Sequence, residues 1–454
     1  MQPTREQLEA WDRDHVWHPF TPMQPYAEEK PLIISHARGC MLVDLDGNEY
    51  IDGVSSLWCN VHGHRVPQID AAVREQLDAV AHSTLLGAAN VPSIRLARRL
   101  VELAPPGLTR VFYSDDGATA VEVALKMAFQ YWRQCATPRP AKTRFLALQR
   151  AYHGDTLGDV SVGDLARFHH LFAPLLFPTF RAPSHYCSRC PLGLERQTCR
   201  VDCFEELAKL VRQHADTLAA VVVEPLMQAA AGMIAAPEGY LRHVREVTRE
   251  CGVLLIADEV AVGIGRTGSM FACEREGVVP DFLCLAKGLT GGYLPLAATL
   301  TTEEVFRAFL GRPEDGRTFY HGHTYTGNQL GCAAALANLD LLSEGGVLET
   351  VPEKSERLRG HLQRMGELAC VGDVRQQGLM AGLELVRDRA TRMPFAPERR
   401  VGPEVCRGAR EHGVLLRPLG DVVVVMPPLA IEHSLLDRLC DVLYNCLSDL
   451  SERT

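Results

Sequence analysis

The sequence predicts an α/β protein with a large domain, built on a mostly parallel sheet, and a smaller α+β domain. Apolar runs of strand length recur through the middle of the chain, and one of them leads into an amphipathic helix. At 454 residues the chain exceeds one typical domain. In the last third, helical segments alternate with strand segments at Val374–Leu385, Val414–Arg417 and Val422–Met426. We therefore expect two lobes.

Composition and charge narrow the class of protein. Apolar residues make up 46% of the chain and charged residues 23%, as in ordinary globular proteins. The net charge of −9 supplies no broad basic face, so we expect small-molecule substrates as partners, with no nucleic acid and no membrane. The first residues are polar. No apolar run approaches the length of a membrane span, which is about 18 residues. We expect a cytoplasmic protein.

The N-terminal region predicts a helix, a hairpin and a loop that carries a tryptophan. The helix is expected around Thr4–Val16, and the two strands near Gly39–Asp44 and Glu49–Asp52. Trp58 follows in a polar loop bordered by glycines. Its ring could present a flat wall to a substrate, or it could anchor the loop.

A candidate phosphate site lies where a strand meets a helix. Arg110–Ser114 has strand character, and Gly117–Gln134 carries apolar residues at helical spacing. The start of this helix, at Gly117 and Ala118, offers unpaired backbone N–H groups and the positive end of the helix dipole, which suit a phosphate monoester. Many helices begin in this way, so this prediction depends on the rest of the site.

Two further strand ends carry candidate site residues. Tyr152 follows the strand Arg144–Leu148, where its ring could stack on a flat cofactor or lie half-buried in a loop. The strand Ala219–Val223 ends at Glu224. This carboxylate could lie near the reaction centre, or it could pair with Arg266 as a structural contact.

The segment from residue 253 to residue 292 carries the strongest chemical signal. Two apolar strands, Val253–Ala257 and Asp281–Ala286, deliver Asp258 and Lys287 at their carboxyl ends, the edge where open parallel sheets bind ligands. A lysine held there and followed by small residues suits Schiff-base chemistry, because its amine must lose a proton to become a nucleophile. Asp258 suits a partner for a pyridine nitrogen. Either residue alone could be an ordinary strand-end residue.

The 15 cysteines include one clustered group. Cys187, Cys190, Cys199 and Cys203 form a C-x2-C-x8-C-x3-C array, preceded by His185. Four thiolates from a short loop can hold a zinc ion or an iron–sulfur cluster. The alternative is a reduced or partly disulfide-bonded surface insertion, so the identity of any metal is left unknown.

The segments LLIADEV, GIGRTG and LAKGLTGG, in this order and spacing, resemble the signature of the class III aminotransferases, which are pyridoxal 5'-phosphate (PLP) enzymes of fold type I. The resemblance implies that Lys287 holds PLP as a Schiff base, that Asp258 keeps the pyridine nitrogen protonated and that Tyr152 contacts the cofactor. The implied domains are an N-terminal segment joining the small domain, a large PLP-binding domain and a C-terminal small domain, over residues 1–63, 64–335 and 336–454.

The same resemblance implies a homodimer with shared active sites. The PLP phosphate would bind at Gly117 and Ala118. Residues His323 and Thr324 would reach the phosphate of the neighbouring subunit. Gly322, just before them, would lie beside the substrate.

Within the class, the segments WHPF, DGVSSLW, YHGDT, HGHTYTGN and LRPLG resemble the biotin-pathway members, which aminate 8-amino-7-oxononanoate. On that resemblance Arg417 binds the substrate carboxylate, for which a guanidinium fork is well suited. Phe20, Trp58 and Tyr152 would complete the substrate pocket. The implied amino donor is S-adenosylmethionine.

Five positions depart from the members that use this donor, which have tyrosine, tryptophan, serine, proline and tyrosine at Phe20, Leu57, Ala118, His323 and Val424. Leu57 and Val424 remove aromatic surface, whereas Phe20 keeps its ring and loses only the hydroxyl, so lysine is an alternative donor. Another class III ω-aminotransferase is a second alternative. A non-catalytic protein on this fold is a third, although the lysine and the phosphate site are intact.

Overall fold

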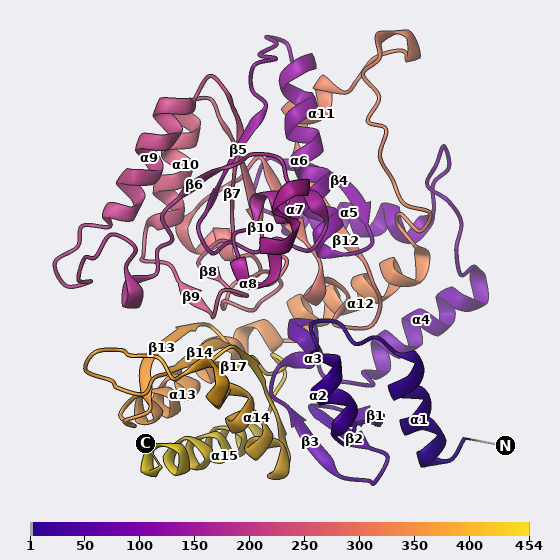
Figure 1. Cartoon of the computed structure of the whole chain (residues 1–454). Helices are drawn as coiled ribbons and strands as arrows, with labels where there is room; N and C mark the ends of the chain where they lie inside the picture. Colours follow the sequence, from indigo (N-terminus) through magenta and orange to yellow (C-terminus); the bar gives the residue numbers. More distant parts are fainter. Residues whose placement is uncertain (1–2, 454) are drawn as a thin grey trace.

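A seven-stranded sheet forms the centre of the computed structural model, which describes residues 3–453 (Figure 1). The strand order is β4-β12-β11-β10-β7-β5-β6. Only β12 runs against its neighbours, so the predicted mostly parallel α/β fold is confirmed. The strands are β4 (Leu108–Ser114), β5 (Arg144–Leu148), β6 (Phe180–Ala182), β7 (Leu218–Val223), β10 (Leu254–Asp258), β11 (Phe282–Leu285) and β12 (Ala297–Thr302).

The central strands are buried on both faces, as their continuous apolar sequences predict. In β10, Leu255 packs into one hydrophobic cluster and Ile256 into another, because successive side chains point to opposite faces. Helix α6 (Gly117–Gln134) covers the face of Ile256. Helices α5, α9, α10 and α12 contribute to the opposite cluster.

Helices lie on both faces of this sheet, and α13, α14 and α15 pack together beside the smaller sheets. The α-helices are α1 (Arg5–His15), α2 (Met23–Glu28), α3 (Ser55–Trp58), α4 (Pro67–Ala79), α5 (Val91–Leu103), α6, α7 (Leu157–Val162), α8 (Ala166–His169), α9 (Asp202–His214), α10 (Tyr240–Glu250), α11 (Glu303–Ala308), α12 (Gln329–Glu344), α13 (Val347–Gly366), α14 (Val401–Glu411) and α15 (His433–Glu452). The 3-10 helices are η1 (His170–Leu175), η2 (Cys187–Arg189), η3 (Ala272–Glu276), η4 (Lys287–Thr290), η5 (Pro313–Asp315) and η6 (Pro397–Arg399). Among the described residues, no helix is both long and apolar enough to cross a membrane.

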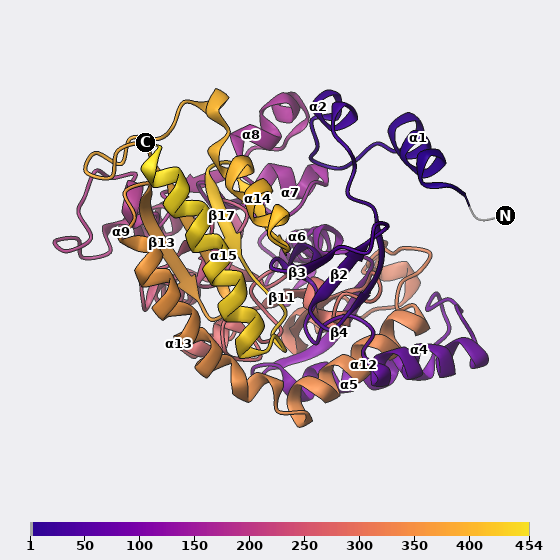
Figure 2. The same ribbon diagram turned by 90° about the horizontal axis from the view of Figure 1, so that it is seen from below.

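Two four-stranded sheets lie outside the central one, and a short hairpin of β8 (Met227–Gln228) and β9 (Ile234–Ala235) completes the strands. The N-terminal sheet contains β1 (Ile34–Arg38), β2 (Met41–Asp44), β3 (Glu49–Asp52) and β15 (Val414–Leu415). The C-terminal sheet contains β13 (Val371–Gln377), β14 (Met380–Leu385), β17 (Val422–Val425) and β16 (Arg417–Leu419). Figure 2 shows α13 and α15 together beside this sheet.

Strand β15 pairs in parallel with β3, so the two ends of the chain share one sheet. The predicted boundaries after residues 63 and 335 stay predictions. One expected element differs from the structure: the segment 374–385 is not one strand but most of the hairpin β13–β14. The chain turns at Gly378, where φ is +58° and glycine avoids the strain that a side chain would bring.

Candidate active site

A cavity of about 710 Å³ opens at the carboxyl ends of the central strands. Its wall comes from the start of α6, the loop after β5 and the segments that follow β10 and β11. Gly117, Ala118, Tyr152 and Lys287 all line it. The fold therefore brings together four residues that the sequence placed in one site from distant segments.

Lys287 is the second residue after β11 and opens η4. Burial lowers the pKa of its amine, and the nearby carboxyl groups of Asp258 and Glu224 only partly oppose this shift. Its Nζ lies 5.6 Å from the centre of the Trp58 ring. An amine in these surroundings loses its proton more readily than an exposed lysine does, as a nucleophile requires.

Asp258 ends β10 and is almost fully buried. Its Oδ2 lies 2.7 Å from Nδ1 of His153, and its Oδ1 accepts a hydrogen bond from the backbone of Val260 at 3.0 Å. The sequence assigned no role to His153, although it stands directly after Tyr152 at a strand end. That position is the signal that could have identified it.

The start of α6 has the form predicted for a phosphate site. Asp116 caps the helix by accepting a hydrogen bond from the backbone N–H of Thr119 at 2.9 Å. The N–H groups before Thr119 are at the start of the helix, where they have no intrahelical partner. A side chain at Gly117 would come within 2.4 Å of Val260, so only glycine permits this close approach. His323 lies nearby, with Nδ1 3.7 Å from Oδ2 of Asp115.

Tyr152 and Glu224 are joined directly. Oε1 of Glu224 accepts from the backbone N–H of Tyr152 at 3.3 Å, and the tyrosine hydroxyl donates to Asp155 at 2.8 Å. Burial, followed by the charge of Asp258, raises the pKa of Glu224 to about 8. The suggested pairing of Glu224 with Arg266 is wrong, because that buried guanidinium donates instead to the backbone oxygens of Asn60 and Pro427.

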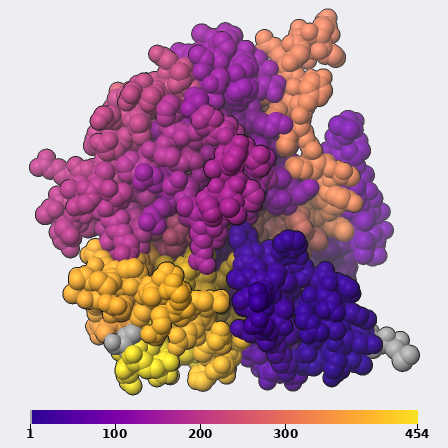
Figure 3. All heavy atoms as spheres, in the orientation of Figure 1, coloured from indigo at the N-terminus to yellow at the C-terminus, as the bar shows by residue number. Residues whose placement is uncertain are grey.

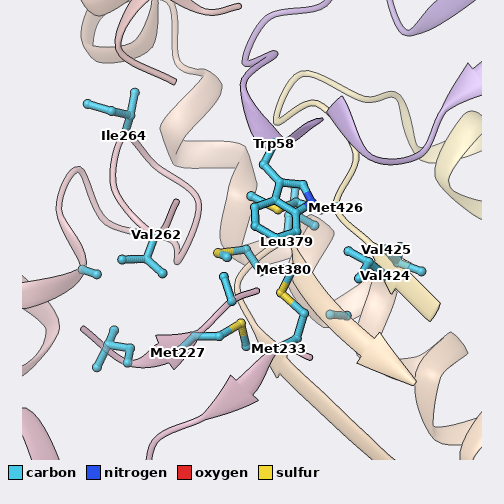
Figure 4. Close-up of a cluster of buried hydrophobic side chains, with 14 of the residues drawn as sticks. Trp58, Met227, Met233, Val262, Ile264, Leu379, Met380, Val424, Val425 and Met426 are labelled. Atoms are coloured by element: carbon cyan, nitrogen blue, oxygen red, sulfur yellow. The ribbon is translucent and has the colours of Figure 1, made fainter. Parts of the chain in front are cut away.

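Trp58 is buried in a cluster whose labelled members include the methionines Met227, Met233, Met380 and Met426 (Figure 4). Its indole N–H has no hydrogen-bond acceptor among residues 3–453. Val424 belongs to the same apolar cluster and is fully buried. Trp58 therefore packs within this cluster, with the Lys287 amine 5.6 Å from its ring centre.

Arg417 and Phe20 lie around Tyr152. Burial lowers the pKa of Arg417, and Tyr152 is the one group that opposes this shift. The Phe20 ring, which is 53% exposed, packs edge-on against Phe168 at 5.3 Å, and Phe168 lies 6.2 Å from Tyr152. Aromatic rings thus extend outward from the cavity.

Gly322 and Thr324 are not part of the cavity wall formed by their own chain. Both are exposed, in the segment between α11 and α12 that stands out from the rest of the molecule (Figures 1 and 3). Tyr320 and Tyr325 in the same segment are 82% and 58% exposed. Among the predicted phosphate-binding residues, Gly117 and Ala118 line the cavity, whereas Thr324 of the same chain does not.

The four clustered cysteines border one small cavity of about 20 Å³, together with His185. All four are free thiols. Within residues 3–453, however, no three Cys, His, Asp or Glu side chains are arranged to share one metal ion. The loop is held instead by the C-terminal sheet, where Arg189 donates to Glu384 at 2.5 Å.

The described residues fit PLP. The cavity is large enough for a cofactor of this size, Lys287 supplies a buried amine, and the glycine at the start of α6 lets a phosphate approach the backbone. Gly154 lets the loop after β5 lie close to the start of α6, because a side chain there would come within 2.4 Å of both Ala118 and Asp159.

Comparisons with known proteins agree with this fit. The family described as aminotransferase class-III matches residues 23–447. A Nitratidesulfovibrio vulgaris protein named adenosylmethionine-8-amino-7-oxononanoate aminotransferase is 56% identical, over 98% of this chain and 82% of its own. The crystal structure of the Methanocaldococcus jannaschii protein of that name is 44% identical, with a TM-score of 0.93 over 98% of this chain and 99% of its own. An (S)-enantioselective omega-transaminase from Thermomicrobium roseum also has a TM-score of 0.93, at 34% identity and 99% coverage of each chain. The chain therefore belongs to the class III aminotransferases and is a PLP-dependent transaminase.

Proposed function

We propose that this aminotransferase converts 8-amino-7-oxononanoate to 7,8-diaminononanoate in biotin biosynthesis, with S-adenosylmethionine as the amino donor. The observation that carries the proposal is that Arg417 has no partner for its charge in the part of the chain that the structure describes. Within residues 3–453, its guanidinium forms no hydrogen bond or ion pair, although the side chain is half-buried beside Tyr152. Even a half-buried cation without a partner loses hydration, and hydrogen bonds to a substrate carboxylate would replace it.

The relatives support the choice of keto substrate. The N. vulgaris protein, 56% identical along nearly this whole chain, is named for 8-amino-7-oxononanoate and adenosylmethionine. Overall similarity of fold does not distinguish this reaction from that of other transaminases, since the T. roseum omega-transaminase is as similar in TM-score. The proposal therefore depends on the substrate pocket.

Bound PLP supplies an aldehyde and an electron-withdrawing pyridine ring, the chemistry that amino transfer needs. We propose that Lys287 would hold the aldehyde through its Nζ and that this amine, when free, would move a proton. The Asp258 carboxylate, oriented by His153, would keep the ring nitrogen protonated. The backbone N–H groups at Gly117 and Ala118 would bind the phosphate, and Tyr152 would lie against the ring.

The choice of donor is supported by the row of rings from Tyr152 through Phe168 to the exposed Phe20. An adenine needs a flat apolar surface, and stacking uses the face of a ring and not a hydroxyl. Leu57, 44% exposed, and the buried Val424 supply less aromatic surface than the family members with this donor have. Lysine is therefore the donor to test against it.

We propose further that the active form is a homodimer in which Thr324 of each chain binds the phosphate at the other chain's Lys287. This is supported by the exposure of Thr324, Tyr320 and Tyr325 in a segment that stands out from its own chain. Closed twofold dimers place such a segment reciprocally on both partners.

The test is conversion of 8-amino-7-oxononanoate by the purified holoenzyme, followed by mass spectrometry of the product. Each reaction receives S-adenosylmethionine alone or lysine alone. We expect the diamine with S-adenosylmethionine. Product with lysine only would overturn the donor, and amination of pyruvate but not of 8-amino-7-oxononanoate would overturn the substrate in favour of an ω-aminotransferase.

A further inference from the structure

The backbone from Ser55 to Trp58 forms one turn of left-handed helix. The four φ angles are +50°, +49°, +80° and +69°, and none of the four residues is glycine. The amide of Trp58 donates to Val54 O at 2.8 Å and that of Cys59 to Ser55 O at 3.0 Å, the spacing of α-helical hydrogen bonds. Side chains of L-residues crowd the backbone in this conformation, so single residues adopt it and runs do not. Surrounding contacts must therefore hold this turn.

The main contact is the carboxylate of Asp52, a fully buried residue at the end of β3. Its Oδ1 accepts from the backbone of Ser56 at 2.8 Å, and its Oδ2 accepts from the hydroxyl of Ser56 at 2.7 Å. His64 Nε2 lies 3.1 Å from the same Oδ2. One carboxylate thus binds both the main chain and the side chain of Ser56, within the turn.

A second contact connects the turn to the C-terminal sheet. The hydroxyl of Ser55 donates to the backbone oxygen of Met426 at 2.6 Å, and the amide of Met426 donates to Gly53 at 2.9 Å. Met426 directly follows β17. Contacts with two sheets therefore hold the turn, against the conformational preference of its own residues.

The handedness of the turn decides where Trp58 points. Successive side chains rotate in opposite senses in left-handed and right-handed helices, so reversal would carry the indole away from its present position. In that position the ring is 6% exposed, and its centre lies 5.6 Å from Nζ of Lys287. Figure 4 shows the indole beside Met380 and Met426.

We propose that Asp52 is a positioning residue, which enforces the left-handed turn and thereby holds the Trp58 ring against the Lys287 amine. This inference rests on the role proposed for Lys287. Backbone strain at a functional site is maintained only where the surroundings dictate it, and here the Asp52 carboxylate supplies two of the hydrogen bonds that do so. Asp52 touches neither the amine nor the cavity wall, so it acts through Trp58.

The test follows Trp58 directly, in holoenzyme labelled with 5-fluorotryptophan. The chain has four tryptophans, and Trp58→Phe assigns the fluorine resonance of interest. In Asp52→Asn and Asp52→Ala we expect this resonance to move by more than its linewidth. The matched control is Asp44→Asn, which alters a buried capping carboxylate of the same sheet, bonded to the backbone of Asn48 at 2.9 Å. It should leave the Trp58 resonance in place.

A rescue variant distinguishes an effect on the turn from a general loss of structure. Leu57 has the most positive φ of the four residues, and its side chain is 44% exposed, so Leu57→Gly should relieve strain with little loss of packing. Added to Asp52→Asn, it should return the Trp58 resonance toward its wild-type position. Leu57→Val should not, because a β-branched residue resists this conformation.

Kinetics complete the test. We expect Asp52→Asn to lower kcat by about tenfold or more at full PLP occupancy, as displaced groups near a reacting centre do. An unmoved Trp58 resonance in folded Asp52→Asn would overturn the proposal, as would equal displacement in Asp44→Asn. Because the fluorine signal needs no substrate, a mistaken assignment of the reaction would leave this result intact.

Discussion

The Nδ1 atom of His153, in the loop after β5, lies 2.7 Å from Oδ2 of Asp258, the last residue of β10 and 105 residues further along the chain. Both side chains are buried, so the contact is shielded from water. It fixes the orientation of the carboxylate that we propose acts on the cofactor's ring nitrogen. His153 therefore lines the cavity and also holds Asp258 in place.

The first prediction tests this pair. Asp258→Asn should lower kcat by orders of magnitude with little change in KM, because the amide cannot keep a ring nitrogen protonated. His153→Ala should lower kcat by a smaller factor, about 10- to 100-fold, because the carboxylate remains but is no longer oriented. Steady-state kinetics at saturating PLP provide both values.

A matched control exists between α13 and α15, where His361 Nε2 lies 2.9 Å from Asp437 Oδ1. His361→Ala removes a histidine–aspartate contact of similar length far from the cavity, and kcat should be unchanged. Equal losses in the two histidine variants would show that His153 acts only on stability.

The second prediction concerns the lysine that holds PLP. Borohydride reduction of the holoenzyme, followed by peptide mapping, should find the pyridoxyl group on Lys287. Lys287→Ala should fold but show no turnover. The control is Lys142→Ala, since Lys142 is also buried, with a pKa lowered to about 8 by burial, but donates to the backbone oxygen of Leu218 at 3.0 Å. A label on any other lysine would contradict the assignment.

The third prediction concerns the pH dependence of stability. Burial raises the pKa of Glu224 from 4.5 to about 8, so between these values the folded protein holds a proton that the unfolded chain has lost. The stabilising contribution is complete below about pH 4.5 and is lost as pH rises through about 8. Glu224→Gln stays neutral and should reduce the fall in the thermal midpoint across that range.

Thermal unfolding of the wild type, of Glu224→Gln and of Glu398→Gln, an exposed control, provides the comparison. Only Glu224→Gln should flatten the dependence of the thermal midpoint on pH. Parallel profiles for all three proteins would mean that Glu224 is ionised in the folded state.

Much of the site could be predicted because its residues follow strands with clear sequence patterns. Lys287 and Asp258 each stand at the carboxyl end of an apolar strand, and such ends converge at one edge of a parallel sheet. Helix α6 was predicted with its observed bounds, since its apolar periodicity begins at a glycine after an aspartate cap.

Other features depend on contacts between distant segments, which a local pattern does not contain. The pairing of His153 with Asp258 is one such contact, and the donation by Arg266 to two backbone oxygens is another. The left-handed turn at Ser55–Trp58 opposes local preference, because nothing in the sequence Ser-Ser-Leu-Trp favours a positive φ. Only its contacts with Asp52 and Met426 explain it.

The fourth prediction concerns the substrate carboxylate. Arg417→Lys keeps a positive charge but loses the planar fork, so KM for 8-amino-7-oxononanoate should rise by about tenfold or more, while kcat changes less. Arg407→Lys is the control, because Arg407 lies on the surface, 3.5 Å from Glu29. Unchanged KM in Arg417→Lys would remove the principal support for the proposed substrate.

The last prediction concerns the shared site. Thr324 is exposed and lies outside the cavity that Lys287 lines, so we expect one chain's threonine to act at its partner's lysine. Lys287→Ala and Thr324→Val homodimers should each be impaired. Mixed under conditions that exchange subunits, they should form a heterodimer in which one site has both native residues and the other has neither.

Random exchange places half of the dimers in this mixed form, so activity should recover to about one quarter of the wild-type value. Exchange of Lys287→Ala chains with chains that carry both substitutions is the control, and it should restore nothing, because no lysine is present in either partner. If Thr324 acted within its own chain, neither chain in the first mixture would hold a complete site. Mixing would then add no activity beyond the sum of the separate variants, whatever the degree of exchange measured by native mass spectrometry.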